Sequence, residues 1–171
     1  MLERKATKKR NCSIEATLRA WLNGAKKIVI AGIGNPLRRD DFVGMEVVQR
    51  LKEKVPENVF LIECETVPEN FLQEIERFKP THVLVIDAAI INEPAGSVRL
   101  IEKLGKAAPA VSTHMLPLQI FCEYLKTSLG AKVALLAIQP KDTSFGEGLT
   151  SEVEGTAQTL AEILVNALRS L

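Results

Sequence analysis

Hydrophobic residues are spaced along this chain in two alternating ways. Short continuous apolar runs predict buried strands, and longer stretches with apolar residues three and four positions apart predict helices that bury one face. The predicted strands are Lys27–Ile33, Val59–Glu63, His82–Asp87, Ser97–Ile101 and Lys132–Ile138. The predicted helices are Asp41–Val55, Pro68–Phe78, Pro117–Leu129 and Ser151–Leu168. Strands and helices therefore alternate along most of the chain.

Strands that are apolar throughout need cover on both faces, and parallel sheets provide it. The sequence therefore predicts an α/β fold, a three-layer sandwich with an open, largely parallel twisted sheet of about five strands flanked by helices. The shorter strand at Ser97–Ile101 alternates in hydrophobicity. It is the strand that we expect to run antiparallel.

The first 26 residues follow a different pattern. They begin with a basic stretch and continue as a weakly helical segment, Ser13–Leu22, which Asn23-Gly24 interrupts. We interpret residues 1–26 as a basic, helical N-terminal extension. Residues 27–171 are then a single domain, because a chain of 171 residues suffices for one sizeable core.

Composition excludes several classes of protein. The formal net charge of +1 gives no general attraction for nucleic acid. Cys12, Cys64 and Cys122 are far apart and form no CxxC pair, so neither a disulfide framework nor a zinc site is indicated. We see no signal-peptide pattern, and the longest nearly apolar run, Val83–Ile91, is too short to span a bilayer. We therefore expect a cytoplasmic protein with no membrane partner.

Three polar residues follow predicted strands at the edge where open α/β sheets form their sites: Asp41, Asp87 and His114. Two carboxylates and an imidazole can bind a borderline divalent metal and leave positions open. Each residue also has a simpler interpretation. Asp40 or Asp41 could cap a helix, and His114 could lie on the surface. Asp87 is harder to dismiss, because a carboxylate that ends an apolar strand must be solvated, paired or functional.

The glycine-rich turn Gly32–Pro36 does not predict a dinucleotide site. The third glycine of GxGxxG would fall at position 37, which is Leu37. Acidic residues also stand where a pyrophosphate would lie. Gly32 and Gly34 are sufficiently explained by a tight strand-to-loop turn. The other histidine, His82, begins a strand at the opposite edge, and we interpret it as structural.

Four segments in register resemble the hydrogenase maturation endopeptidases. Gly32–Gly44 is similar to their GxGNxxxxDDxxG signature, and Val85–Ala88 followed by Pro94–Val98 is similar to their second acidic motif. Ser112–Leu118 resembles their histidine motif. Ala137–Pro140 resembles the GIQP segment of the branch acting on hydrogenase 3-type large subunits. Two positions depart from the pattern: Pro-Ala-Gly replaces Pro-Gly, and Ala137 replaces glycine. The resemblance runs from about residue 27 to the C-terminus.

This resemblance implies an endopeptidase of phosphorylase/hydrolase-like fold that removes the C-terminal extension of a nickel-loaded [NiFe]-hydrogenase large-subunit precursor. The precursor supplies the nickel, no tightly held cofactor is expected, and the enzyme is expected to be a monomer. Carried over residue by residue, the nickel-contacting trio falls on Asp41, Asp87 and His114. Asp40 matches the other acid of the first motif, which either stabilises the loop or assists catalysis. The general base is Asp40 or one of the trio.

Other interpretations remain open at this point. Cys122 could be a nucleophile, although its apolar helical surroundings favour core packing, as does the strand position of Cys64. Peptidyl-tRNA hydrolase is a second possibility, because its first motif resembles part of Gly32–Pro36. That enzyme needs a histidine in the following loop, and this chain has none there. A non-catalytic metal-sensing maturation chaperone is the third possibility. The loop Gln139–Thr150 is either a plain, flexible surface loop or a contact surface for the precursor, with Phe145 as a docking residue.

Overall fold

The computed structural model describes residues 14–104 and 115–171. Its sheet contains β1 (Ile28–Ile33), β2 (Val59–Glu65), β3 (His82–Ala88), β4 (Val98–Ile101) and β5 (Lys132–Ile138) in the order β2-β1-β3-β5-β4. β1 pairs in parallel with β2 and β3, and β3 pairs in parallel with β5. β4 runs antiparallel to β5, which confirms the prediction for the shortest strand.

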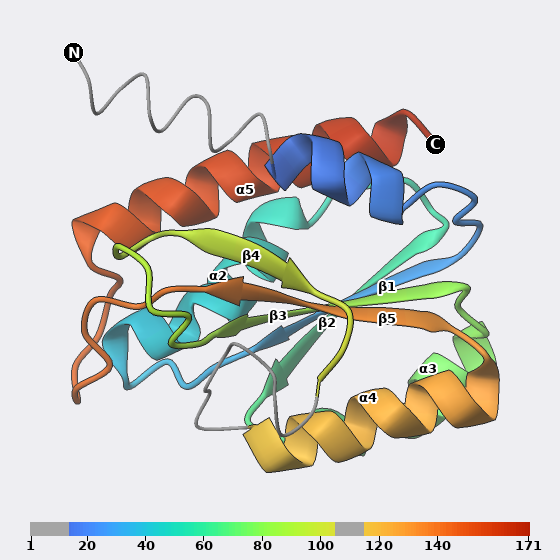
Figure 1. Cartoon of the computed structure of the whole chain (residues 1–171), viewed down its shortest axis with the longest axis horizontal. Coiled ribbons are helices and arrows are strands. Elements are labelled where there is room, and N and C mark those ends of the chain that lie inside the picture. Colours follow the sequence, from blue (N-terminus) through green and yellow to red (C-terminus); the bar gives the residue numbers. More distant parts are fainter. Residues whose placement is uncertain (1–13, 105–114) are drawn as a thin grey trace.

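Helices cover both faces of this sheet (Figure 1). α2 (Val43–Leu51), α5 (Ser151–Arg169) and the helical residues 14–21 share one hydrophobic cluster with one sheet face. α3 (Leu72–Phe78) and α4 (Met115–Leu129) share a second cluster with the other face. The 3₁₀ helices η1 (Arg39–Phe42) and η2 (Pro68–Phe71) lead into α2 and α3. The predicted three-layer α/β sandwich is confirmed.

The central strand β3 explains why its sequence is apolar without a break. All seven residues of β3 are buried. Leu84 and Ile86 belong to the cluster beneath α2 and α5, and Val83 and Val85 belong to the cluster beneath α3 and α4. Because side chains alternate along a strand, Asp87 lies on the same face as Val83 and Val85.

Several predicted boundaries are wrong. The predicted helix Pro68–Phe78 is η2 followed by α3, α4 begins at Met115 and not at Pro117, and other ends differ by one residue. The predicted helix Asp41–Val55 is in fact η1 followed by α2, which ends at Leu51. Val55 is partly buried against the core from the following turn, so its apolar character reflects packing and not a further helical turn. Glu53 in that turn has a left-handed backbone, with φ at 62°. β2 extends two residues beyond its prediction, to Glu65.

The helical residues 14–21 pack into the main core. Leu18 and Leu22 are fully buried in the cluster that contains α5. Trp21 meets His82 edge to face, with ring centroids 5.1 Å apart. His82 is buried at the amino edge of the sheet, which confirms its structural interpretation. In the described parts of the chain, no helix is long and apolar enough to cross a membrane.

Candidate active site

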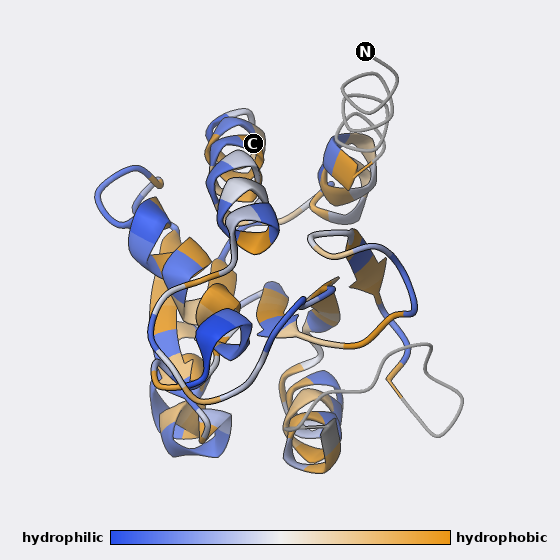
Figure 2. Cartoon of the chain, turned by 90° about the vertical axis from the view of Figure 1, so that its left-hand side faces the viewer, coloured by the Kyte–Doolittle hydropathy of each residue, from blue (hydrophilic) through white to orange (hydrophobic). Residues whose placement is uncertain are grey.

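α2 begins in direct contact with the carboxyl ends of β1 and β3. A Cβ atom on Gly44 would lie 2.1 Å from the carbonyl oxygen of Ile86 and 2.4 Å from that of Ile33, so only glycine fits there. Gly44 follows Asp41 by three residues, and Ile86 immediately precedes Asp87. This close approach therefore brings the two predicted acids to the same edge of the sheet. Figure 2 views the molecule from this side.

Asp41 is buried and holds its own loop in place. Its Oδ2 accepts a hydrogen bond from the backbone N–H of Asn35 at 3.0 Å, and the Asn35 side chain accepts one from the backbone N–H of Leu37 at 2.9 Å. A Cβ atom on Gly34 would lie 2.1 Å from the carbonyl oxygen of Asp41. Gly34 is thus required for this approach, in agreement with the backbone role predicted for it.

Asp87 is fully buried near the end of β3, and the chain beyond it is braced by Gln139. The side-chain oxygen of Gln139 accepts the backbone N–H of Ile91 at 2.8 Å. Its backbone N–H donates to Ser97, and its carbonyl accepts from Gly96, both at 2.8 Å. The motif Ala137–Pro140 contains Gln139 but does not indicate this role. Its bracing role depends on partners some 40 positions away, which no local pattern reveals.

Asp40 is fully buried and accepts four hydrogen bonds, all from the segment that follows β5. The donors to Oδ2 are the backbone N–H groups of Lys141 (2.8 Å) and Asp142 (3.0 Å) and the hydroxyl of Thr150 (2.9 Å). The backbone N–H of Thr150 donates to Oδ1 at 2.7 Å. The sequence left two roles open for Asp40, loop stabilisation and assistance to catalysis. These four bonds support loop stabilisation. A part for Asp40 in catalysis stays a prediction.

The segment 140–149 is fastened to the loop after β1. The backbone N–H of Gly146 donates to Leu37, and that of Arg39 donates to Gly146, both at 2.9 Å. Asp40 donates its own backbone N–H to Asp142 at 3.1 Å. The outer side of the segment is exposed, as predicted, and Phe145 is 80% exposed. The segment is nevertheless tied down along its length, whereas the sequence suggested a flexible connector.

The third predicted ligand, His114, lies outside the described residues. Among residues 14–104 and 115–171, no three histidine, cysteine or carboxylate side chains gather closely enough to hold a metal ion. The described part of the site therefore supplies two carboxylates, from Asp41 and Asp87. Such a pair would leave most coordination positions of a divalent metal to other ligands.

The two described cysteines belong to the core. Cys64 and Cys122 are buried in the cluster beneath α3 and α4. Burial raises the pKa of the Cys64 thiol to about 12, and burial raises the pKa of the Cys122 thiol to about 12 as well. Because the thiolate is the nucleophilic form, neither side chain is prepared to attack a peptide bond. Core packing, the interpretation favoured from the sequence, is confirmed for both.

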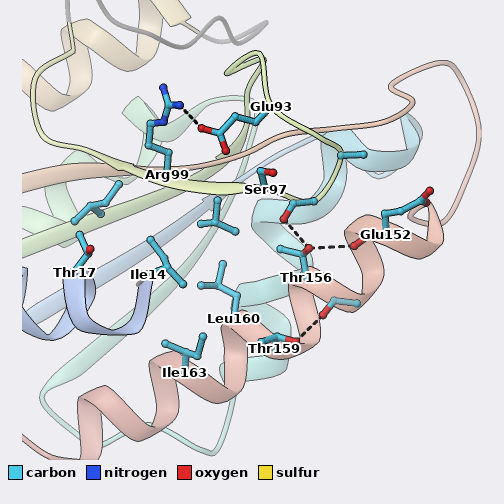
Figure 3. Close-up of a pocket in the computed structure, with 15 residues that line it drawn as sticks. Ile14, Thr17, Glu93, Ser97, Arg99, Glu152, Thr156, Thr159, Leu160 and Ile163 are labelled. Carbon is cyan, nitrogen blue, oxygen red and sulfur yellow. Dashed lines mark hydrogen bonds and ion pairs between the residues drawn. The ribbon is translucent and has the colours of Figure 1, made fainter. Parts of the chain in front are cut away.

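A cavity of about 730 Å³ lies away from these acids, between the helical residues 14–21, β4 and α5 (Figure 3). Arg99 pairs with Glu93 at its rim, and the hydroxyl of Thr156 donates to the carbonyl of Gly96 at 2.8 Å. The cavity is on the α5 side of the sheet, whereas Asp87 faces the side of α3 and α4. We therefore do not assign it to the candidate active site.

The chain matches known proteins along most of its length. The family model for hydrogenase maturation protease matches residues 45–167. The hydrogenase 3 maturation protease of Escherichia coli K12 is 27% identical over 137 residues, covering 80% of this chain and 87% of that protein. A Methanocaldococcus jannaschii protein, itself assigned only provisionally as a hydrogenase maturation protease, is 37% identical over 158 residues, covering 88% of this chain and 93% of its own.

Solved structures agree with these sequence matches. The crystal structure of the [NiFe] hydrogenase maturation protease HycI from Thermococcus kodakarensis KOD1 superimposes with a TM-score of 0.83 at 35% identity. The superposition covers 90% of this chain and 99% of that one. With a family match over residues 45–167 and a fold that superimposes on a member of the family, the chain belongs to the hydrogenase maturation protease family.

Proposed function

We propose that this endopeptidase removes the C-terminal extension of a [NiFe]-hydrogenase large-subunit precursor and that it recognises nickel already bound by the precursor. The observation that carries this proposal is the convergence of Asp41 and Asp87 at the carboxyl edge of the sheet. The contact of Gly44 with Ile33 and Ile86 produces that convergence. We further propose that the enzyme acts in the cytoplasm and as a monomer.

The nickel belongs to the substrate in this proposal, and the protease reads it. Asp41 and Asp87 would each offer carboxylate oxygen to open positions on the metal, and His114 would offer an imidazole nitrogen. A precursor without nickel would lack these contacts and would be held poorly against the site. Only a precursor that contains nickel gains binding energy from these contacts. Cleavage would therefore be selective for precursor in which nickel is already bound.

Peptide hydrolysis then needs a water molecule and a proton acceptor. A divalent metal can polarise the carbonyl to be cleaved or lower the pKa of a bound water. The water oxygen attacks the carbonyl carbon, a carboxylate of the site accepts the water proton, and the amide nitrogen leaves as an amine after receiving a proton. We propose that Asp41 or Asp87 accepts this proton. Asp40 has its oxygens committed to four loop donors.

The test is cleavage of purified large-subunit precursor, prepared with and without nickel, by wild type and by Asp87→Asn. We expect wild type to shorten only the nickel-loaded precursor. We expect Asp87→Asn, which keeps the size of the side chain but loses its charge, to be slower by about a hundredfold or more, within the range seen when one catalytic group is removed. Intact mass spectrometry of the precursor reports the cleavage.

Glu57→Gln is the matched control, because Glu57 is an exposed carboxylate just before β2, at the amino edge of the sheet. It should cleave as wild type does. Equal cleavage of both precursor forms would show that nickel is not read. Full activity of Asp87→Asn, with thermal unfolding like that of wild type, would remove Asp87 from the site.

A further inference from the structure

Among the described residues, four of the eight exposed large hydrophobic side chains lie on loops at the edge of the sheet that carries Asp41 and Asp87; the other four are Leu116, Ile120 and Tyr124 on α4 and Leu171 after α5. Each of the four parallel strands is followed by one: β1 by Leu37, β2 by Val67, β3 by Ile90 and β5 by Phe145. Their exposed fractions range from 36% for Val67 to 80% for Phe145. Apolar surface that gathers at one edge of a protein commonly marks a place where another molecule binds.

Leu37 and Phe145 stand on two loops that are joined by hydrogen bonds. The carbonyl of Leu37 accepts the backbone N–H of Gly146, the residue next to Phe145, at 2.9 Å. The side chain of Arg38 donates from Nε to the carbonyl of Thr143 at 3.1 Å, and Arg38 and Gly146 form a parallel β-bridge. We call Leu37 and Phe145, with the loop residues that join them, the Leu37–Phe145 platform.

The backbone of the platform is preorganised by hydrogen bonds within the protein itself. Its backbone is fixed by the bonds between the two loops and, from beneath, by the four bonds that Asp40 accepts. Two apolar side chains on a rigid support lose little conformational freedom when a partner covers them. Such preorganisation raises affinity for a given contact area.

The platform is also connected to the candidate active site. The backbone N–H of Leu37 donates to the side chain of Asn35, and the backbone N–H of Asn35 donates to Asp41. Ile90 follows Asp87 by three residues on the neighbouring loop. A protein that presents a peptide bond to these two acids has to lie over the same loops, so the substrate itself is the occupant that this position favours.

We propose that the Leu37–Phe145 platform docks an apolar surface of the folded large-subunit precursor, beside the bond to be cleaved and independently of nickel. This inference rests on the proposed function and divides recognition into two parts. The acids read the metal, and the platform holds the protein that carries it. A second copy of this chain seated on the platform would instead cover the loops through which a protein substrate reaches Asp41 and Asp87.

The experiment compares wild type, Phe145→Ser and Leu37→Ser by two measurements. The first is the Kd for nickel-free precursor, measured by biolayer interferometry, because the acids contribute little to that complex. The second is steady-state cleavage of nickel-loaded precursor. We expect Phe145→Ser to raise both Kd and KM about tenfold, as loss of an aromatic anchor does, with kcat within about twofold of wild type. Leu37→Ser should act in the same direction.

Leu171→Ser is the matched control, because Leu171 is 54% exposed but lies just beyond the C-terminal end of α5. It should leave Kd and KM unchanged. If wild type cleaves the loaded precursor but Phe145→Ser keeps the wild-type Kd, the docking proposal is wrong and the proposed function stands. If wild type forms a dimer that Phe145→Ser dissociates, the platform binds a second copy and the proposal is also wrong. Failure of wild type to cleave either precursor removes the proposed function together with this inference.

Discussion

Thr150 donates two hydrogen bonds to Asp40 across 110 residues of sequence, one from its backbone N–H at 2.7 Å and one from its hydroxyl at 2.9 Å. Thr150 directly precedes α5, so its hydroxyl stands where a side chain would ordinarily cap that helix. Here the hydroxyl binds Asp40 instead. The first loop of the site and the start of the last helix are therefore fixed to each other.

Asp40→Asn should destabilise the protein although it changes almost no volume. The carboxylate faces donors on both of its oxygens, so the amide group of asparagine would have to point at one or more N–H groups. We expect the free energy of unfolding to fall by about 2–4 kcal/mol, the usual cost of leaving buried donors unsatisfied next to a lost charge. Urea denaturation measures this. Glu147→Gln, at an exposed carboxylate of the same segment, should leave stability nearly unchanged.

Gly44→Ala should displace α2 from the strand ends. The added methyl group would overlap the carbonyl oxygens of Ile86 and Ile33, at 2.1 Å and 2.4 Å. We expect a loss of about 3 kcal/mol or more, at or beyond the upper end for overpacking, together with loss of cleavage. Gly155→Ala is the opposite case, because nothing lies within 4 Å of its Cβ position in α5. It should raise stability by about 0.5–1 kcal/mol. Equal effects of the two substitutions on thermal unfolding would contradict this account.

Stability should decline as the pH falls below about 6.5, the ordinary pKa of histidine, because of His82. Burial lowers the pKa of His82 in the folded protein, and the positive charge of Lys132 lowers it further, against a backbone hydrogen bond with Trp21 that raises it. The unfolded chain therefore binds a proton that the folded chain resists. The stability that neutral His82 preserves is present above the unfolded pKa and is lost as the pH falls toward the lowered folded pKa.

The measurement is urea denaturation at a series of pH values between 8 and 5, for wild type and for His82→Gln. Other titrating groups are common to both proteins, so the difference between the two curves isolates His82. We expect the wild type to lose more stability than the variant over this range. Parallel curves would show that the environment of His82 does not disfavour its charged form.

Cys122→Ala and Cys64→Ala should both keep kcat within about twofold of wild type, because each thiol is packed in the core with its pKa raised to about 12. Each substitution should cost about 1–2 kcal/mol of stability through lost packing. In the folded wild type at pH 8, iodoacetamide should leave both thiols unmodified, and peptide mass spectrometry after digestion locates the label. A loss of activity that leaves stability intact would restore the cysteine mechanism.

Much of the fold was predictable because burial leaves a local signature. β3 is covered on both faces, and its continuous apolar sequence predicts that burial. Asp87 was recognisable for the same reason, as a carboxylate at the end of a strand that has no other charge. The parity of the strand then fixes the face on which Asp87 lies, once Val83 and Val85 are known to face α3 and α4.

Other features have no local signature. Val55 continues the helical spacing of α2, yet the chain has already turned at Lys52–Lys54 to begin the return to β2. Its apolar side chain is used in the turn, so spacing alone could not end the helix at Leu51. The partners of Asp40 lie about a hundred residues away, and those of Gln139 lie on the loop between β3 and β4. Such contacts arise only when the sheet order places these loops together.

That sheet order has a consequence for how the protein is made. Of the strands in residues 14–104 and 115–171, β5 comes last in the sequence, yet it lies between β3 and β4 and is the one strand paired with β4. A nascent chain that has emerged only as far as α4 holds Asp41 and Asp87 but lacks the hydrogen bonds that Gln139 and Thr150 make to the loops around them. The residues that brace those loops, Gln139 and Thr150, leave the ribosome later. The edge that carries Asp41 and Asp87 can therefore take its braced form only after β5 and the start of α5 have been synthesised and have folded onto the rest of the protein.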